Sequence, residues 1–519
     1  MKKKFNITGL CFPQEHYMAD VSKKLKQTLS MVEMGEYFII NRPRQYGKTT
    51  TLYTLADMLR KTGDYIVLNS SFEGIGDVIF NTEANFSMGF VRILKKYASV
   101  SSSELHEWLK IQDKKVEDLD ALSDFITEFV SQTNKKVVLM IDEVDKSSNN
   151  QLFISFLAML RNKYLERGSF KTFHSIVLAG VHDVKSLKLK IRPGEEAKYN
   201  SPWNIAADFK VDMNLQPFEI KPMLDEYATD KSMKIDTQQI AEQLFYYTSG
   251  YPFLVSKLCK MLDEEIIQNG EWTPNDVEFA VKQLLKQSNT NFDSLIKNLE
   301  NNQELYDLVY AVAINNEFMP FNIHNPLTAL GVLLGILTSR NDSDRIVIHN
   351  RIYNEVIVNY MSDKMLQDNI TRQSDLGAGY KNFDKTLNME AVLLGFQTFM
   401  KKEYSKKDRN FLEKNGRLVF LAFIKPIING SGYDFKEPQV SEEKRLDVVI
   451  TYLHQKFVAE LKIWYGEKAH EKGLAQLANY LDIQSLTEGY LLIFDHSEVK
   501  NWHSEWIKAH GKKIFAVWI

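Results

Sequence analysis

The chain of 519 residues has little cysteine, no excess of positive charge and no long apolar run. Cys11 and Cys259 are its only cysteines, and neither has a metal-ligand partner at useful spacing, which argues against a disulfide scaffold or a zinc ribbon. Lysines and arginines number 64 against 67 aspartates and glutamates, a formal net charge of −3. Contact with nucleic acid would therefore require a local basic patch.

No segment is apolar over the length that a transmembrane helix needs. The most apolar stretch, LTALGVLLGIL at residues 327–337, is too short to cross a bilayer. Lysines at positions 2–4 are typical of the start of a signal peptide, but no sustained apolar core follows them. We therefore expect a soluble, cytoplasmic protein without membrane contact.

The length and composition are those of several globular domains. With 44% apolar and 25% charged residues, the chain should build two to four cores. The first 200 residues alternate short aliphatic runs with amphipathic segments, which predicts an α/β fold with a doubly wound parallel sheet. The predicted buried strands are residues 37–41, 64–70, 136–142 and 174–180.

The segment NRPRQYGKTT follows the first predicted strand and precedes a helix, the context that a phosphate-binding loop requires. Lys48 would reach the β- and γ-phosphates of ATP, and Thr49 would ligate Mg²⁺. Arg42 occupies the position of the usual first glycine, but Pro43 can make the turn rigid instead. Arg42 and Arg44 either add charge near the phosphates or are solvated. The predicted nucleotide contacts in this loop are Arg42, Pro43, Arg44, Gln45, Tyr46, Gly47, Lys48, Thr49 and Thr50.

An acidic pair ends another buried strand, KVVLMIDE at 136–143. Asp142 fits the carboxylate that holds the magnesium shell, and Glu143 fits the base that orients and activates water. GKT alone is as compatible with a surface turn as with a nucleotide site. The two motifs together predict a site that binds ATP and Mg²⁺ and hydrolyses ATP.

Several segments resemble the bacterial AAA-ATPase-like family, whose loop commonly reads arginine-proline-arginine before Gly-Lys-Thr/Ser; they include EYFIINRPRQYGKTTTL, MIDEVDK, LAGVHDVKSLK and TSGYPFLVSKLC. The resemblance covers most of the first 360 residues and implies a fold similar to AAA+ and STAND ATPases. It implies a γ-phosphate sensor at His182 or Asp183 and a nucleotide contact at Pro252 in the lid. The alternatives are a polar strand end for His182 and a helix stop for Gly250. Arg161 is either a trans-acting finger or an ordinary helix-face arginine.

These features and changes in composition divide the chain into five predicted segments. They are an ATPase core at 1–215, a helical lid at 216–290, a winged-helix-like region at 291–361, a polar linker at 362–388 and a second α/β domain at 389–519. In the winged-helix-like region the short strand RIVIHN lies between two helical segments. In the second α/β domain, strand patterns recur at 445–453, 456–465, 489–495 and 513–519.

The second α/β domain contains EKRLDVVITYLHQKFVAELKIW. Asp447 begins one strand, while Glu460 and Lys462 lie two apart on the next, so the strand period puts both on one face. A hairpin would bring Asp447 beside them. Two carboxylates that bind Mg²⁺ or Mn²⁺, with a lysine that steadies the attacking water or the developing charge, suit phosphodiester hydrolysis. Exposed strand charges are the alternative.

Further residues strengthen this interpretation. Glu413 lies on the preceding helix where a third acid is expected, and Gln476 and Tyr480 lie on the following helix. The arrangement resembles the restriction-endonuclease-like PD-(D/E)XK nuclease superfamily, to which the ATPase family is often fused, although Leu446 replaces the usual proline. The basic cluster at 401–417 either attracts phosphates or is a solvated helix face.

Three hypotheses follow for function. The leading one is an ATP-driven or ATP-gated nuclease that acts on DNA or RNA through the C-terminal domain. The second is a STAND-like switch whose nuclease fold is a non-catalytic binding platform. The third is a nucleotide-dependent toxin or anti-phage effector, and association into a homo-oligomer is left open.

Overall fold

The chain divides into two compact units in the computed structural model. Unit 1 comprises Met1–Gln287 and Val332–Gly335, and unit 2 comprises Ser288–Gly331 and Ile336–Ile519. The structure describes residues 2–112, 115–144, 151–181, 203–266, 270–314, 318–340, 343–369, 380–403, 409–428, 432–435, 448–464, 467–495 and 502–519.

Unit 1 contains a parallel sheet of order β1-β4-β3-β2. Its strands confirm the predicted ones to within one residue, because strands buried on both faces read as continuous aliphatic runs. Beyond β1, the Ala207 amide donates to the Tyr37 carbonyl at 2.8 Å, which extends the sheet by an isolated bridge. The strands are β1 Tyr37–Asn41, β2 Tyr65–Ser71, β3 Lys136–Asp142 and β4 Ser175–Gly180.

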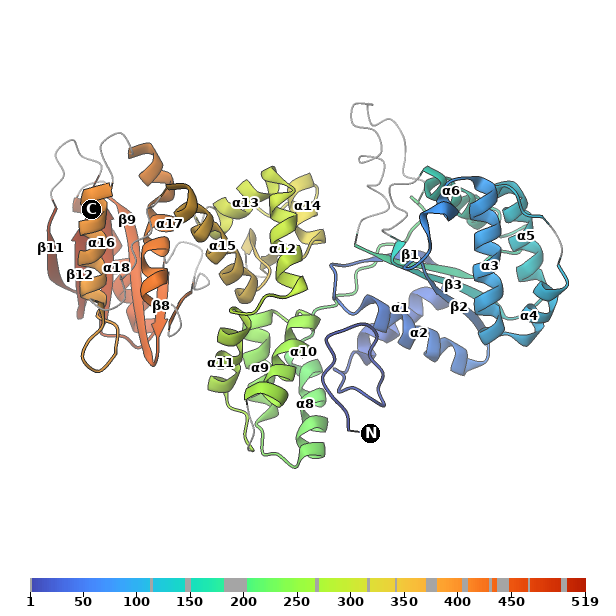
Figure 1. The fold of residues 1–519 in the computed structure, drawn as a ribbon, viewed down its shortest axis with the longest axis horizontal. Helices are drawn as coiled ribbons and strands as arrows, with labels where there is room; N and C mark the ends of the chain where they lie inside the picture. Colours follow the sequence, from blue (N-terminus) through green and yellow to red (C-terminus); the bar gives the residue numbers. More distant parts are fainter. Residues whose placement is uncertain are drawn as a thin grey trace. The chain divides into compact units, whose positions relative to one another are not determined.

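Helices cover both faces of this sheet (Figure 1). On one face, strand residues such as Ile39 and Leu139 pack with Phe86 and Phe156 of the covering helices. The carboxyl ends of the parallel strands share one edge, the place where open α/β sheets bind ligands. One face carries α1 Ser22–Glu33 and α2 Lys48–Thr62, and the other carries α3 Glu83–Ser101, α4 Ser103–Lys110, α5 Leu119–Ser131 and α6 Gln151–Leu165.

The helical segment that follows the sheet also belongs to unit 1. Pro217 opens its first helix at a position where the missing N–H costs nothing, and the Gln216 amide donates to Glu219 Oε2 at 2.7 Å. Its helices are α8 Pro217–Lys231, α9 Thr237–Thr248, α10 Pro252–Met261 and α11 Pro274–Leu284.

Unit 2 begins with helices and a β-hairpin, whereas the sequence predicted a single short strand, at 345–350, between two helical segments. The strands β5 and β6 pair antiparallel. The helix α15 is longer than predicted and continues to Asn369, inside the segment predicted as a linker; residues 370–379 of that segment lie outside the described residues. The elements are α12 Thr290–Glu300, α13 Gln303–Ala313, α14 Pro326–Leu333, β5 Leu337–Arg340, β6 Ser343–Ile348 and α15 Arg351–Asn369.

The most apolar stretch, residues 327–337, is not one helix. It contains most of α14, a turn at Gly335 with φ +72°, and the first residue of β5. None of the helices in the described part of the chain is both long and apolar enough to cross a membrane.

The rest of unit 2 is a mixed sheet of order β11-β12-β10-β9-β8-β7. The neighbours β9, β10 and β12 run parallel, and β7, β8 and β11 pair antiparallel with their neighbours. The strands are β7 Gly432–Phe435, β8 Val448–Tyr452, β9 Gln455–Ile463, β10 Glu488–Phe494, β11 Ser504–Ala509 and β12 Lys512–Trp518; the helices are α16 Met389–Glu403, α17 Arg409–Ile428 and α18 Glu467–Ile483.

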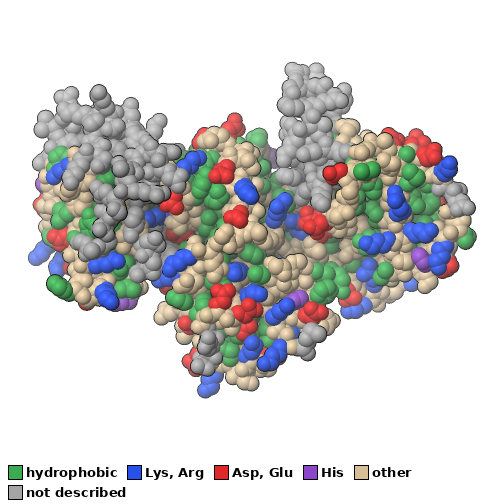
Figure 2. Space-filling model, in the orientation of Figure 1, with side chains coloured by type: hydrophobic (Ala, Val, Ile, Leu, Met, Phe, Trp, Pro, Cys, Tyr) green, Lys and Arg blue, Asp and Glu red, His purple; other side chains and the backbone are tan. Residues whose placement is uncertain are grey.

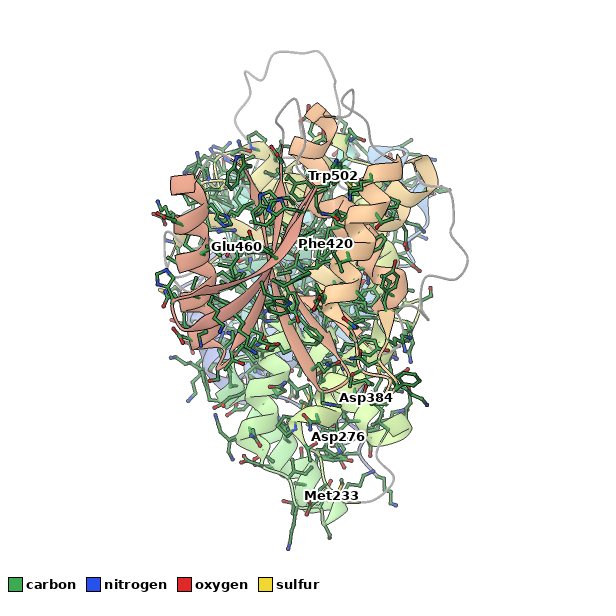
Figure 3. All side chains as sticks on the ribbon, turned by 90° about the vertical axis from the view of Figure 1, so that its left-hand side faces the viewer. Met233, Asp276, Asp384, Phe420, Glu460 and Trp502 are labelled. Atoms are coloured by element: carbon green, nitrogen blue, oxygen red, sulfur yellow. The ribbon has the colours of Figure 1, made fainter. Side chains whose placement is uncertain are left out.

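This sheet lies between α18 on one face and α16 and α17 on the other (Figure 3). Leu474, Leu477 and Leu481 of α18 form one core with Val458 of β9 and Leu491 of β10. Since side chains alternate along a strand, Glu460 and Lys462 share the α18 face with Val458. The fold therefore places both charged residues at the end of this core.

Candidate functional site

The loop between β1 and α2 is a turn with two left-handed residues, Gln45 at φ 59° and Gly47 at φ 75°. Gly47 is the N-cap of α2. A left-handed conformation suits glycine and is uncommon for other residues. The loop thus ends at a helix N-terminus, where backbone amides and the helix dipole favour anions.

Lys48, the first residue of α2, is buried with 6% of its surface exposed. Its ammonium group donates to the carbonyl oxygens of Arg42, at 2.9 Å, and Pro43, at 2.8 Å. A buried charge needs such partners because the interior does not solvate it. The loop therefore wraps around its own lysine.

Thr49 and Asp142 meet as the sequence predicted. Thr49 Oγ1 donates to Asp142 Oδ2 at 2.6 Å, and Asp142 Oδ1 accepts from the Glu143 amide at 2.9 Å. Asp142 is 5% exposed at the end of β3. β1, β4 and β3 run parallel, so Asp142 at the end of β3 lies at the same edge of the sheet where β1 enters the loop.

Glu143 directly follows β3 and is left-handed, with φ 56°. This conformation costs a non-glycine residue of the order of 1 kcal/mol or more and is commonly found at functional sites. Glu143 is partly exposed beside the buried Asp142. The backbone thus turns sharply at the predicted water-activating residue.

The two arginines of the loop have different environments. The Arg42 guanidinium donates to the carbonyls of Asn41, at 2.9 Å, and Val211, at 2.8 Å, and lies over the Phe209 ring. Burial lowers the pKa of Arg42. Arg44, in contrast, is exposed. The side chain of Arg42 therefore joins the loop to the 209–211 segment.

The loop also contacts elements that the sequence did not link to it. The Tyr251 hydroxyl donates to the Arg44 carbonyl at 2.7 Å, and the Tyr46 and Tyr251 rings lie 4.6 Å apart, edge to face. Tyr46 also donates to the Asn214 side chain, and Thr50 Oγ1 accepts from the Cys11 amide at 3.3 Å. Only Tyr251, in the GYP segment, had a sequence signal.

The backbone of Gly250 lies directly against the backbone of Leu215. Its φ is +74°, and an added Cβ would lie 2.1 Å from the Leu215 carbonyl oxygen. The Leu215 amide donates to the Gly250 carbonyl at 2.8 Å. Pro252 then begins α10. Glycine at this position therefore places Tyr251 against the loop.

Three other predicted residues complete this region. His182 and Asp183 lie outside the described residues, directly after the buried Val181. Arg161 lies on α6 and is partly exposed. Their proposed roles as sensor and finger stay predictions.

In unit 2 the structure brings together Glu460, Lys462 and Gln476. Lys462 Nζ lies 2.7 Å from Glu460 Oε1 and donates to Gln476 Oε1 at 3.3 Å. Glu460 is 1% exposed, and the Lys462 side chain is 36% exposed. Figure 3 labels Glu460 on the sheet and Phe420 on α17, which covers the other face. The lysine thus connects the buried acid to α18.

The structure describes only some of the other residues predicted for this cluster. Asp447 lies outside the described residues, one position before β8. Glu413 falls within α17, and its side chain lies outside the described part. Tyr480 is 5% exposed in the core between α18 and the sheet. Among the described residues, no group of three or more His, Cys, Asp or Glu is placed to hold a metal ion.

Charged side chains of both signs are mixed on the described surface in Figure 2. Lysines and arginines lie next to aspartates and glutamates on both units in this view. This distribution agrees with the formal net charge of −3. Of the predicted basic cluster at 401–417, residues 404–408 lie outside the described residues.

A curated relative, an uncharacterised WD repeat-containing protein of Synechocystis sp., is 21% identical over 290 residues, or 54% of this chain. The chain spans only 22% of that protein's length.

Solved structures similar to the chain include an ORC2 protein and a RuvB variant. The ORC2 protein of Aeropyrum pernix, solved as ADPNP-ADP complexes, is 14% identical with a TM-score of 0.35, covering 66% of this chain and 93% of its own. A RuvB variant of Thermotoga maritima is 14% identical with a TM-score of 0.34, and the match covers 64% of this chain and 93% of the RuvB chain.

A family model described as an AAA-like domain matches residues 14–318, which is more than half of the chain. The match includes the loop around Lys48, the strand that ends at Asp142 and the helices up to α13. The α/β core with its parallel sheet lies within this match. The chain belongs to the AAA-like domain family.

Proposed function

We propose that the loop at residues 42–50, with Asp142 and Glu143, binds ATP with Mg²⁺ and hydrolyses it. The observation that carries this proposal is the 2.6 Å hydrogen bond from Thr49 Oγ1 to Asp142 Oδ2. It joins the first turn of α2 to the end of β3, across a distance of 93 residues in sequence. A hydroxyl and a carboxylate at a helix N-terminus are the oxygen donors that Mg²⁺ takes beside a phosphate.

Each residue has a role that follows from its position. The Lys48 ammonium would exchange the carbonyls of Arg42 and Pro43 for phosphate oxygens, which are stronger, charged acceptors. Thr49 and Asp142 would hold Mg²⁺, which neutralises phosphate charge when bound. The carboxylate of Glu143 would orient a water molecule and accept its proton.

Glu143→Gln tests the hydrolytic role. The variant should bind Mg·ATP like the parent, because the phosphate contacts remain, but should release phosphate at least about a hundredfold more slowly, the usual contribution of a general base. Glu73→Gln is a matched control, since Glu73 is an exposed carboxylate in the loop after β2. Equal phosphate release by the parent and Glu143→Gln would remove Glu143 from the mechanism.

We also propose that unit 2 cleaves phosphodiester bonds in DNA or RNA with a divalent metal, Mg²⁺ or Mn²⁺. The support is the contact of Lys462 with both Glu460 and Gln476. The order of elements supports it further: β7, β8 and β9 form an antiparallel meander, and β10 returns parallel to β9 after α18. This order resembles the PD-(D/E)XK arrangement.

In this proposal Glu460 and Asp447 hold the metal, with Glu413 as a third acid. Carboxylate oxygens suit both Mg²⁺ and Mn²⁺. Lys462 stabilises the negative charge that develops on the phosphate or steadies the attacking water, and Gln476 fixes the lysine. Bound metal would lower the pKa of a coordinated water molecule.

A cleavage assay tests the second proposal. The parent should cut single- or double-stranded DNA or RNA in Mg²⁺ or Mn²⁺, and EDTA, Asp447→Ala, Glu460→Gln and Lys462→Ala should each stop it. Lys456→Ala is the control, because Lys456 lies on the same strand and face but bonds Gln484 instead. Each substrate should be tested without nucleotide, with ATP and with a non-hydrolysable analogue.

The outcomes separate the hypotheses. A cleavage rate that depends on nucleotide supports an ATP-gated nuclease, which is also the mechanism of an effector. A cleavage rate that does not change with nucleotide indicates two independent activities. ATP hydrolysis without cleavage of any substrate, and without metal binding that depends on Glu460, favours the switch with a binding platform.

A further inference from the structure

The turn at residues 332–335 belongs to a different unit from its neighbours. Val332–Gly335 is part of unit 1, whereas Gly331 and Ile336 are part of unit 2. The Gly335 amide donates to the Val332 carbonyl at 2.9 Å, and the Ile336 amide donates to the Gly331 carbonyl at 2.9 Å. The chain therefore leaves unit 2 at the end of α14 and returns to it at β5 through one tight turn.

Gly335 packs directly on the phosphate loop. A Cβ added to Gly335 would lie 2.7 Å from Pro43 Cγ, 3.0 Å from Pro43 Cβ and 3.6 Å from the Tyr251 ring. The φ of +72° also disfavours any other residue. Glycine is needed here both for the turn and for contact with the proline ring.

Pro43 and Arg44 are each contacted from outside the loop. Gly335 touches the Pro43 ring, and the Tyr251 hydroxyl donates to the Arg44 carbonyl at 2.7 Å. The carbonyl of Pro43 in turn accepts from Lys48 at 2.8 Å. Two consecutive residues, Pro43 and Arg44, thus link the turn, the start of α10 and the lysine that would face the phosphates.

We propose that Gly335 and Tyr251 are positioning residues of the phosphate loop, and that the 332–335 turn moves with the Pro43 peptide when the loop binds nucleotide. This proposal rests on nucleotide binding by the loop. When phosphate takes the Lys48 ammonium, the Pro43 carbonyl loses its donor and the peptide is released. Because the Pro43 ring touches Gly335, a shift of that peptide moves the turn between α14 and β5.

Gly335→Ala tests the positioning role. The added methyl group must displace the Pro43 ring, whose carbonyl accepts from Lys48, so the dissociation constant for Mg·ADP, measured by calorimetry, should rise about tenfold, the lower range of overpacking costs. Gly63→Ala is the matched control, because Gly63 has φ +81° and open space around its Cβ position. It has the same backbone penalty and should bind Mg·ADP like the parent.

A double-mutant cycle makes the test specific to the contact. Pro43→Ala removes the Cγ atom that the new methyl group meets, so Gly335→Ala should weaken binding less in that background than in the parent. Tyr251→Phe keeps the ring and removes the hydroxyl that donates to the Arg44 carbonyl, which should weaken binding about threefold to tenfold. A general loss of folding would give neither the rescue nor the difference from Gly63→Ala.

Hydrogen exchange gives a second readout without any change at Gly335. In the parent, Mg·ADP should change the exchange rates of the Gly335 and Ile336 amides, and Lys48→Ala should abolish this response. The inference would be overturned if Mg·ADP left these exchange rates unchanged, or if Gly335→Ala and Gly63→Ala bound Mg·ADP with equal affinity. Either result would leave the proposal of nucleotide binding intact. Normal Mg·ADP binding by Lys48→Ala would instead refute the proposed function itself.

Discussion

Replacing Gly250 by alanine should damage unit 1 far more than replacing Gly63, although both glycines are left-handed and adjoin helix ends. At Gly250 the new Cβ would lie 2.1 Å from the Leu215 carbonyl oxygen and 2.8 Å from its amide nitrogen. Both are backbone atoms, and the Leu215 amide is bonded to the Gly250 carbonyl at 2.8 Å. The contact therefore cannot be relieved by turning a side chain.

The expected magnitude follows from three contributions. A left-handed alanine costs about 1–2 kcal/mol, the overlap with a fixed backbone about 1–3 kcal/mol, and the strained hydrogen bond about 1 kcal/mol. The sum is about 3–6 kcal/mol for Gly250→Ala. Gly63→Ala has only the first contribution, because nothing lies within 4 Å of its Cβ position.

Native-state hydrogen exchange of the α10 amides measures this difference locally. The opening free energy of Leu254–Leu258 should fall by several kcal/mol in Gly250→Ala and remain near the parent value in Gly63→Ala. Binding of Mg·ADP should weaken as well, because Tyr251 follows Gly250 and donates to the Arg44 carbonyl. Equal protection of α10 in the two variants would refute the close-approach argument.

Two further predictions concern charged groups. Lys462→Met should lower the free energy of unfolding of unit 2 by about 1–3 kcal/mol, because the carboxylate of Glu460, which is 1% exposed, loses its ammonium partner. Adding Glu460→Gln to this variant should recover part of the lost free energy, as measured by urea unfolding. Burial, and secondarily Lys136, lower the pKa of His174 from its ordinary 6.5. The unfolded chain then binds more protons, so stability falls as pH drops below about 6.5, and His174→Gln should flatten this dependence between pH 7.5 and 5.5.

The sequence predicted the parallel sheet because its strands are buried on both faces. β1 matched residue for residue, and the pairing of Thr49 with Asp142 followed from two motifs of known geometry. The edge strand β11 escaped prediction because its sequence, SEWIKA, is largely exposed and alternates with charges. A pattern of burial cannot reveal a strand that is not buried.

The residues that contact the phosphate loop also escaped prediction, but for a different reason. Arg42 donates to a carbonyl 169 residues away, and Gly335 meets Pro43 from the turn that follows α14. Backbone carbonyls carry no residue-type signal, so such contacts are invisible in the sequence. Glu460 and Lys462 were predictable from the strand period, whereas the roles of Asp447 and His182 stay predictions because both lie outside the described residues.

Calorimetric titration of Mg·ATP into Lys48→Ala, beside Lys61→Ala, tests nucleotide binding at this loop most directly. Both lysines lie on α2, but Lys48 is buried at its first residue, whereas the Lys61 side chain is 75% exposed and paired with Asp57. Loss of the Lys48 cation should abolish measurable binding with the fold intact, and Lys61→Ala should bind like the parent. Unchanged affinity in Lys48→Ala would contradict the assignment of residues 42–50 as a phosphate-binding loop.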